Sequence, residues 1–282
     1  MEYAYVTLIA AAALWGAAAG VLVPRPAYRM SVEPEEAWRN ACPAGHPLTG
    51  PAQGWLGTAR CASCAVSPVP AVSVPVPAAT PGPGAPEAPG EPGDGTAVRA
   101  PAVYRNSVVV PAVTALACAA LAAAVGSRPE LAVWLLLAPF AVLLALVDRH
   151  VHRLPDQLTL PLAVAAAVLL GGAALLPGAG GSWPTALLGG PVLGAAYLVL
   201  FLVNPNGMGF GDVKLALSLG VALGWYGWEV LFVGAFAGFL LGAVYGLGLV
   251  VLRGAGRGTA IPFGPFMISG ALLGLLLGAL AV

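Results

Sequence analysis

Eight runs of apolar residues dominate the chain, and short polar segments separate them. The runs cover roughly 4–23, 107–126, 131–147, 158–176, 185–203, 213–226, 230–252 and 262–281. Most are about 20 residues long, enough for a helix to cross a hydrocarbon core of about 30 Å. An open sheet cannot satisfy its backbone in lipid, so helices are expected. The pattern predicts an all-α polytopic membrane protein with about eight transmembrane helices, of which the sixth is the shortest.

The composition agrees with a membrane protein. Hydrophobic residues make up 59% of the 282 residues and charged residues only 9%, whereas soluble domains carry about 25% charged residues. The formal net charge is zero and no large basic patch is present, which argues against nucleic-acid binding. The first apolar run follows Glu2 rather than a basic residue, so we expect an uncleaved first helix within residues 1–23 and not a secretory signal.

The basic residues predict the orientation of the helices. If the N-terminus lies outside, the cytoplasmic segments are 24–106, 148–157, 204–212 and 253–261. Of the 12 Lys and Arg residues, only Arg128 then falls in an outer loop. Cytoplasmic loops are normally the ones enriched in Lys and Arg. We therefore expect the N-terminus outside.

The first cytoplasmic segment forms a small insertion with two parts. Residues 24–65 contain three of the four cysteines, and clustered cysteines in a short segment suggest a metal site rather than a disulfide framework. Residues 66–106 are rich in Pro, Ala and Gly, which predicts a disordered linker. Residues 107–282 contain the other seven apolar runs and form the predicted membrane domain.

Two aspartates occupy matching positions at the cytoplasmic border. Asp148 closes the third apolar run, which passes from outside to inside, and Asp212 opens the sixth run, which starts inside. Two carboxylates at close range share a proton and can activate a water molecule. Simpler roles are also open: Asp212 could be a helix N-cap, and Asp148 could pair with Arg153.

The ends of the two helices suggest different roles for the aspartates. A helix N-terminus favours an ionised Asp212 and a helix C-terminus disfavours an ionised Asp148, so we expect the first as base and the second as acid. Three glycines, Gly207, Gly209 and Gly211, precede Asp212. We expect them to adopt backbone angles that other residues avoid and to let a substrate strand approach.

Three sequence motifs match one known family in order and spacing. "GMGFGDVKL" resembles the G-x-G-D motif of the type IV prepilin peptidases, which are membrane aspartic proteases. "DRHVHRLPDQLTLP" is similar to their other aspartate motif, and "AIPFGPFMISGALLG" is similar to the segment before their last helix. The resemblance covers roughly residues 107–282.

The resemblance implies a function. Asp148 and Asp212 align with the catalytic aspartates, and Asp156 falls at a position where we expect it to cap the fourth helix. The substrates would be type IV prepilin or pseudopilin precursors, cut on the cytoplasmic side of the bacterial inner membrane. Cleavage would follow a glycine and precede a hydrophobic helix. Proteolysis in this family needs no metal and no cofactor.

The cysteine segment departs from the family pattern. Many members carry two C-x-x-C pairs that bind zinc in a region linked to methylation. Here the second pair is intact, Cys61 to Cys64, whereas Gly45 replaces a cysteine of the first. Cys42, His46, Cys61 and Cys64 could still form a Cys₃His zinc site, or the site could be degenerate. N-methylation of the new terminus with S-adenosylmethionine stays open.

Other function classes were weighed against the protease. Paired acids within a membrane also occur in proton- or cation-coupled transporters, although those acids usually lie near mid-membrane. A non-catalytic scaffold for pilus assembly is the third alternative. His150 and His152 are interpreted as solvated loop residues. The expected partners also include the lipid bilayer, and self-association is left open.

Overall fold

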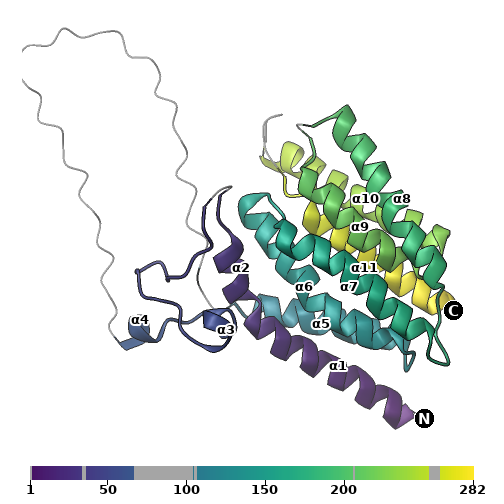
Figure 1. Cartoon of the computed structure of the whole chain (residues 1–282), viewed down its shortest axis with the longest axis horizontal. Helices are drawn as coiled ribbons and strands as arrows, with labels where there is room; N and C mark the ends of the chain where they lie inside the picture. The colour runs from purple at the N-terminus through teal and green to yellow at the C-terminus, as the bar shows by residue number, and fades with distance from the viewer. Residues whose placement is uncertain (1, 34–35, 67–103, 105–106, 206, 254–260) are drawn as a thin grey trace, which may run out of the picture.

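A computed structural model of the chain describes residues 2–33, 36–66, 104, 107–205, 207–253 and 261–282. This part of the chain contains eleven helices and no strand (Figure 1). Eight helices coincide with the eight predicted runs: α1 (Glu2–Leu22), α5 (Val109–Val125), α6 (Glu130–Val151), α7 (Asp156–Ala174), α8 (Trp183–Val203), α9 (Phe210–Gly224), α10 (Trp228–Arg253) and α11 (Gly264–Ala281). The prediction of an all-α fold is confirmed.

Six of these helices are long and apolar enough to cross a membrane, namely α1, α6, α7, α8, α10 and α11. Helix α5 is apolar but has 17 residues, and α9 has 15 residues. At a rise of about 1.5 Å per residue, α9 is only about 22 Å long. The polytopic character is confirmed, and α9 is the shortest of the eight, as expected. Both chain termini lie at the same end of the bundle (Figure 1).

Helix α9 lies at the centre of the bundle, where it contacts α7, α8, α10 and α11. Its contact with α8 is made by glycines, because a Cβ atom on Gly220 would overlap the backbone carbonyl of Gly189. A Cβ on Gly224 would lie 2.6 Å from the carbonyl oxygen of Thr185. Small residues allow helices in membranes to pack backbone against backbone. This contact fixes the helix that carries Asp212.

A buried carboxylate ties together loops at the end of the bundle opposite Asp148. Glu130, in the first turn of α6, is fully buried. It accepts the backbone N–H of Gly180 at 3.1 Å and the hydroxyl of Tyr226 at 3.5 Å. These partners come from the α7–α8 and α9–α10 connections. A buried carboxylate needs such donors, so the start of α6 and these two connections are held in one arrangement.

The insertion after α1 contains three short helices, α2 (Pro24–Met30), α3 (Pro51–Gly54) and α4 (Ala62–Val66). Arg25 and Arg29 of α2 are buried. Their guanidinium groups donate to the carbonyl oxygens of Thr49 and Gln53, at 2.5 and 3.0 Å. These bonds attach the cysteine-containing segment to the helix that follows α1. The predicted linker, 66–106, lies outside the described residues except at its Val66 end and at Tyr104.

Candidate functional site

Asp148 and Asp212 lie inside helices rather than in the adjoining loops. Asp148 is in the last turn of α6, because this helix continues to Val151, four residues beyond the predicted end. Asp212 is in the first turn of α9, which starts at Phe210. The side chains are 4% and 6% exposed. Both carboxylates are therefore largely shielded from solvent and held on rigid elements.

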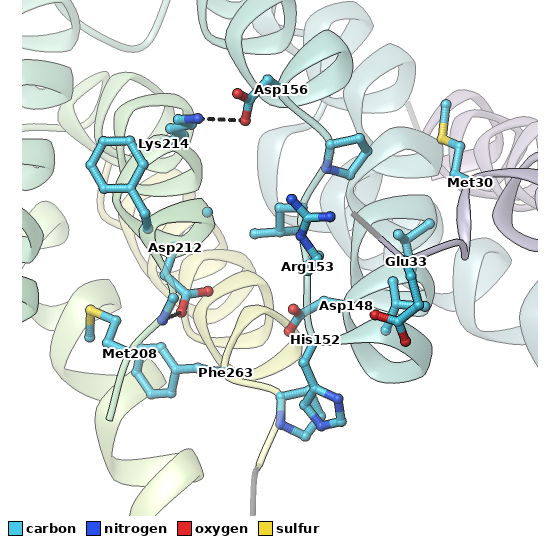
Figure 2. A pocket seen from close by; sticks show the side chains of 18 of the residues that line it. Met30, Glu33, Asp148, His152, Arg153, Asp156, Met208, Asp212, Lys214 and Phe263 are labelled. Carbon is cyan, nitrogen blue, oxygen red and sulfur yellow. Dashed lines mark hydrogen bonds and ion pairs between the residues drawn. The ribbon is translucent and has the colours of Figure 1, made fainter. Parts of the chain in front are cut away.

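Both carboxylates line one pocket of about 920 Å³ at the same end of the bundle. Figure 2 shows them pointing into this pocket from opposite walls, close enough for the charge of one to act on the other. Helices α7 and α11 each contact both α6 and α9. The two aspartates thus face one another across a pocket, rather than across a direct contact between α6 and α9.

A backbone N–H from a third helix holds Asp148. The N–H of Gly264 donates to Asp148 Oδ2 at 2.9 Å. Gly264 is the first residue of α11, and a Cβ atom there would lie 2.8 Å from the same oxygen. Only glycine allows this approach. The sequence analysis noted Gly264 only as part of the segment before the last helix and gave it no role at the site.

Asp212 is held by the start of its own helix. It is the third residue of α9, and its Oδ2 accepts the N–H of Gly209, the N-cap residue, at 3.1 Å. This is the carboxylate half of a capping box. The capping role and the pocket position therefore coexist in one side chain.

The argument that Asp148 is the acid because it ends a helix is incomplete. Asp148 closes α6, but its carboxylate contacts the N-terminus of α11 through Gly264. Asp212 likewise contacts the N-terminus of α9. Each carboxylate thus faces a partial positive charge, and helix ends do not distinguish the two roles.

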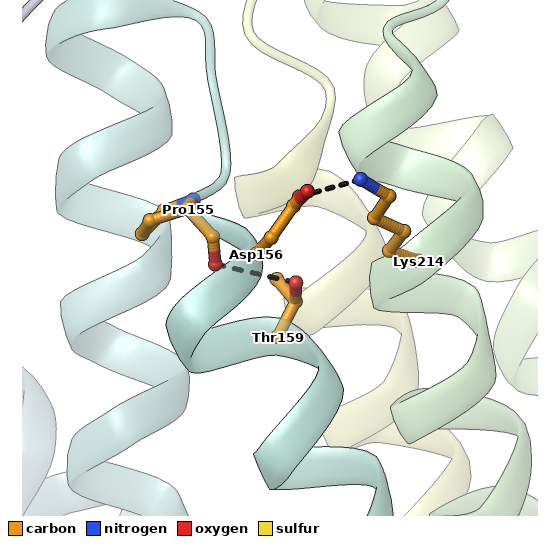
Figure 3. Close-up of polar contacts among 4 residues, drawn as sticks. All are labelled: Pro155, Asp156, Thr159 and Lys214. Atoms are coloured by element: carbon orange, nitrogen blue, oxygen red, sulfur yellow. Dashed lines mark hydrogen bonds and ion pairs between the residues drawn. The ribbon is translucent and has the colours of Figure 1, made fainter. Parts of the chain in front are cut away.

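Asp156 pairs with a lysine instead of capping its helix. Its Oδ1 lies 2.6 Å from Lys214 Nζ, whose side chain comes from the first turns of α9 (Figure 3). The N-cap residue of α7 is Pro155, and its carbonyl oxygen accepts the Thr159 hydroxyl at 3.3 Å. The prediction that Asp156 caps α7 is wrong. The ion pair joins the starts of α7 and α9 at the rim of the pocket.

Comparison with known proteins connects this geometry to a family. Residues 135–247 match the sequence profile described as the type IV leader peptidase family. These residues include both Asp148 and Asp212. This part of the chain is therefore similar to the type IV leader peptidase family. No solved structure matches the chain.

Curated proteins similar to the chain are named prepilin leader peptidase/N-methyltransferase. The protein from Aeromonas salmonicida is 39% identical over 154 residues, 51% of this chain and 48% of that protein. The one from Pseudomonas aeruginosa is 34% identical over 140 residues, 48% and 46% of the two chains. The one from Burkholderia pseudomallei is 34% identical over 192 residues, 64% and 57%. The chain spans about half the length of these curated relatives.

The glycines near Asp212, within the matched segment, do not use unusual backbone angles. Gly209 has φ −77° and ψ 146°, and neither Gly207 nor Gly211 has a positive φ. The expectation of angles closed to other residues was wrong. Gly211 instead lies close to α6's neighbouring loop, because a Cβ there would lie 3.1 Å from that of Leu154.

The two histidines after Asp148 differ in their surroundings. His150 lies within α6 and its Nδ1 donates to the carbonyl oxygen of Leu146 at 2.6 Å, so the interpretation as a loop residue was wrong for it. His152 ends α6 with φ 52° and lines the pocket.

The pocket extends beyond the matched leader peptidase segment. Met30, the last residue of α2, and Val32, Glu33 and Trp38, which follow it, form part of its wall. Figure 2 shows Glu33 on the same side of the pocket as Asp148. Sequence reasoning missed this wall, since these residues are separated from Asp148 by more than a hundred positions. Phe263, next to Gly264, lines the opposite side.

The four residues of the predicted metal site come together, outside the leader peptidase segment. Their ligand atoms all lie within 4.8 Å of one another. Cys42 Sγ and Cys64 Sγ are 3.7 Å apart, and the three Sγ–Nδ1 separations to His46 are 3.3 to 3.7 Å. Tetrahedral zinc with bonds of about 2.3 Å to sulfur and about 2.1 Å to nitrogen requires separations of about 3.8 and 3.6 Å. The donor set therefore fits a tetrahedral metal ion.

The two cysteines of the C-x-x-C pair, Cys61 and Cys64, differ in their surroundings. Backbone hydrogen bonding at Cys64 lowers the pKa of the Cys61 thiol to about 6, whereas loss of hydration raises the pKa of Cys64 to about 11. Sharing of a proton between neighbouring thiols produces such opposite shifts.

Proposed function

We propose that the chain is a membrane aspartic endopeptidase that removes the leader from type IV prepilin or pseudopilin precursors. The observation that carries this proposal is the pair Asp148 and Asp212, facing one another across a single pocket, each fixed by a backbone N–H. The match of residues 135–247 to the leader peptidase family supports it. So do the names of the relatives.

The reaction follows from two carboxylates that share one proton. One aspartate, ionised, takes a proton from a water molecule between them as the water attacks the peptide carbonyl. The other aspartate, protonated, donates its proton to the carbonyl oxygen. The proton taken from the water then passes to the nitrogen of the leaving amine. The hydrogen bonds from Gly209 and Gly264 both use Oδ2. Oδ1 of each aspartate is assigned to the water and the substrate.

We place this pocket on the cytoplasmic side of the bacterial inner membrane, with the N-terminus outside. The distribution of Lys and Arg supports this orientation. The pocket lies at the end of the bundle that carries the cysteine segment, since residues after α2 form part of its wall. Cleavage after a glycine and before a hydrophobic helix would place the scissile bond at this border, where Asp148 and Asp212 lie.

We assign a structural zinc ion to Cys42, His46, Cys61 and Cys64. The fit of their separations to a tetrahedral ion supports this. Such an ion would fold the insertion that adjoins the pocket wall, and it takes no part in peptide hydrolysis. N-methylation stays open: the relatives' names include it, but the family match does not extend to the cysteine segment.

The test is leader removal by the purified chain in lipid nanodiscs, with a prepilin as substrate. Asp148→Asn and Asp212→Asn should each lower the rate by about 10²- to 10⁴-fold, the usual contribution of a positioned acid or base. Asp156→Asn, which removes the half-exposed partner of Lys214, is the matched control and should stay active. A transporter or a scaffold would leave the precursor uncut in every case. The mass of the new terminus reports methylation in the same sample.

The pH dependence tests the shared proton. The wild-type rate should rise and then fall with pH, because activity needs one protonated and one ionised carboxylate. Either Asn variant should lose this shape in whatever activity remains. A pH profile unchanged in both variants contradicts the dyad, even if the chain proves to be a peptidase.

A further inference from the structure

A second cavity, an apolar groove of about 340 Å³, follows the outside of the bundle between α5, α6 and α11. Along α6 it runs from Trp134 to Arg149, a distance of about 22 Å at 1.5 Å per residue. Small side chains line it on α6, namely Ala138, Ala141 and Ala145, and buried residues of α7 and α9, Ala166 and Ala222, line it as well. The groove is therefore long and narrow and lies parallel to the membrane-crossing helices.

The lining offers one charged group, at one end. Among the described residues that line the groove, Arg149 alone is charged, and its side chain is exposed. The polar side chains of the wall have partners within the protein: Ser218 donates to the Thr159 carbonyl at 3.1 Å and Ser269 to that of Pro265 at 2.7 Å. A molecule bound in the groove would therefore contact apolar side chains along its length and one guanidinium group at its end.

The size of the groove selects between occupants. A helix with side chains is about 10–12 Å wide, so 22 Å of it would fill roughly 2,000 Å³. Carbon atoms in contact lie about 4 Å apart, so a polymethylene chain of the same length fills roughly 280 Å³. The groove offers about 340 Å³, so the polymethylene chain can lie within it, whereas a helix would lie mostly outside it and insert only some side chains.

We propose that this groove binds one acyl chain of an anionic phospholipid, with the lipid phosphate paired to Arg149. Arginine forms bidentate hydrogen bonds with phosphate, and basic residues at a membrane surface attract anionic lipids. Arg149 closes α6 at the predicted inner face, where the headgroup of an inner-leaflet lipid lies. The site is separate from the peptidase pocket and does not depend on the proposed reaction.

The position of the groove gives the lipid a structural role. Arg149 follows Asp148 on α6, and Pro265, which lines the groove, follows Gly264 on α11. The hydrogen bond between Asp148 and Gly264 joins the same two helices at 2.9 Å. A chain in the groove contacts both helices directly behind this bond and fills space that their small side chains leave open.

Native mass spectrometry of the full chain, released from nanodiscs of equal phosphatidylglycerol and phosphatidylcholine, tests the proposal. The wild type should retain one phosphatidylglycerol, favoured about fivefold over phosphatidylcholine, the preference expected from one basic residue at a membrane surface. Arg149→Gln should abolish the preference and Arg149→Lys should keep it. Ala141→Phe, which fills the groove, should remove the retained lipid, whereas Ala195→Phe on the exposed face of α8 should not.

Three results would overturn the proposal. The wild type could retain both lipids equally, or Ala141→Phe could retain the same lipid as the wild type. A photo-cross-linker at position 141 could capture protein, either a second copy or a precursor helix, instead of lipid. If Ala141→Phe does not stay monodisperse, Ala145→Leu narrows the same channel with a smaller side chain and gives the same test.

Discussion

Replacing Gly264 by alanine is a sharp test of how Asp148 is held. A Cβ atom at this position would lie 2.8 Å from Asp148 Oδ2 and 3.1 Å from its Cγ. Because the contact involves the carboxylate itself, the added methyl must push the aspartate away from the Gly264 N–H. The hydrogen bond of 2.9 Å would then lengthen or break, while both aspartates remain in the chain.

The size of the effect follows from the bond that is lost. A hydrogen bond to a charged group contributes about 1.5–3 kcal/mol. At about 1.36 kcal/mol for each factor of ten, Gly264→Ala should lower kcat/KM for leader cleavage by roughly 10- to 150-fold. The assay is cleavage of a prepilin by the purified variant in nanodiscs, followed by mass spectrometry.

Gly209→Ala is the matched comparison. Gly209 also donates its N–H to a carboxylate of the pocket, but its Cβ would lie 3.6 Å from Asp212 Oδ2, an ordinary contact. Its φ of −77° and ψ of 146° suit alanine. The change in kcat/KM should therefore stay within about twofold. Gly172→Ala on α7, with open space around its Cβ, controls for the expression and folding of glycine variants.

The reasoning is refuted if Gly264→Ala keeps more than half of the wild-type kcat/KM. It is equally refuted if both alanine variants lose activity to the same extent, since a general need for glycine would then explain the result. Thermal unfolding of each variant shows whether a loss of activity reflects the pocket or the fold.

Three further predictions concern the surroundings of the site. Lys214→Met should change stability by no more than about 1 kcal/mol in thermal unfolding, because its partner Asp156 is half exposed; a larger loss would mean that the ion pair holds the helices together. Gly220→Ala should destabilise the chain by about 1–3 kcal/mol through overpacking against α8, and an unchanged melting temperature would contradict the glycine contact. Metal analysis should find about one zinc per chain in the wild type, and Cys61→Ser or His46→Ala should remove it. A wild-type protein that contains no zinc would contradict the assignment.

The hydrophobic pattern was sufficient to place the eight long helices, because lipid demands continuous apolar helices of fixed length. It also placed Asp148 and Asp212 at the same depth in the membrane, which is why the two were considered together. Depth follows from topology alone, so the pairing needed no knowledge of how the helices pack. The ends of α6 and α9 were misplaced by a few residues, since a polar residue at the border fits inside a helix as well as beside it.

The contacts between distant segments could not be predicted. Gly264 reaches Asp148 across 116 residues, which depends on how α6 and α11 pack. Asp156 was assigned as a cap from its position alone, but Lys214, which was available as a partner, decided its contact. The separations of Cys42, His46 and the C-x-x-C pair could not be read from the sequence either, although the four residues that come together were identified.

The wall of the pocket has a consequence for dividing this protein into parts. The segment shared with the leader peptidase family ends at residue 247, but Gly264 lies beyond it and Glu33 far before it. A fragment cut to the family boundaries would keep both aspartates and lose one donor and one side of the cavity. For the proposed peptidase, the smallest active unit is therefore expected to extend beyond the matched segment at both ends, and exchanges of the N-terminal region between relatives are expected to alter which precursors it accepts.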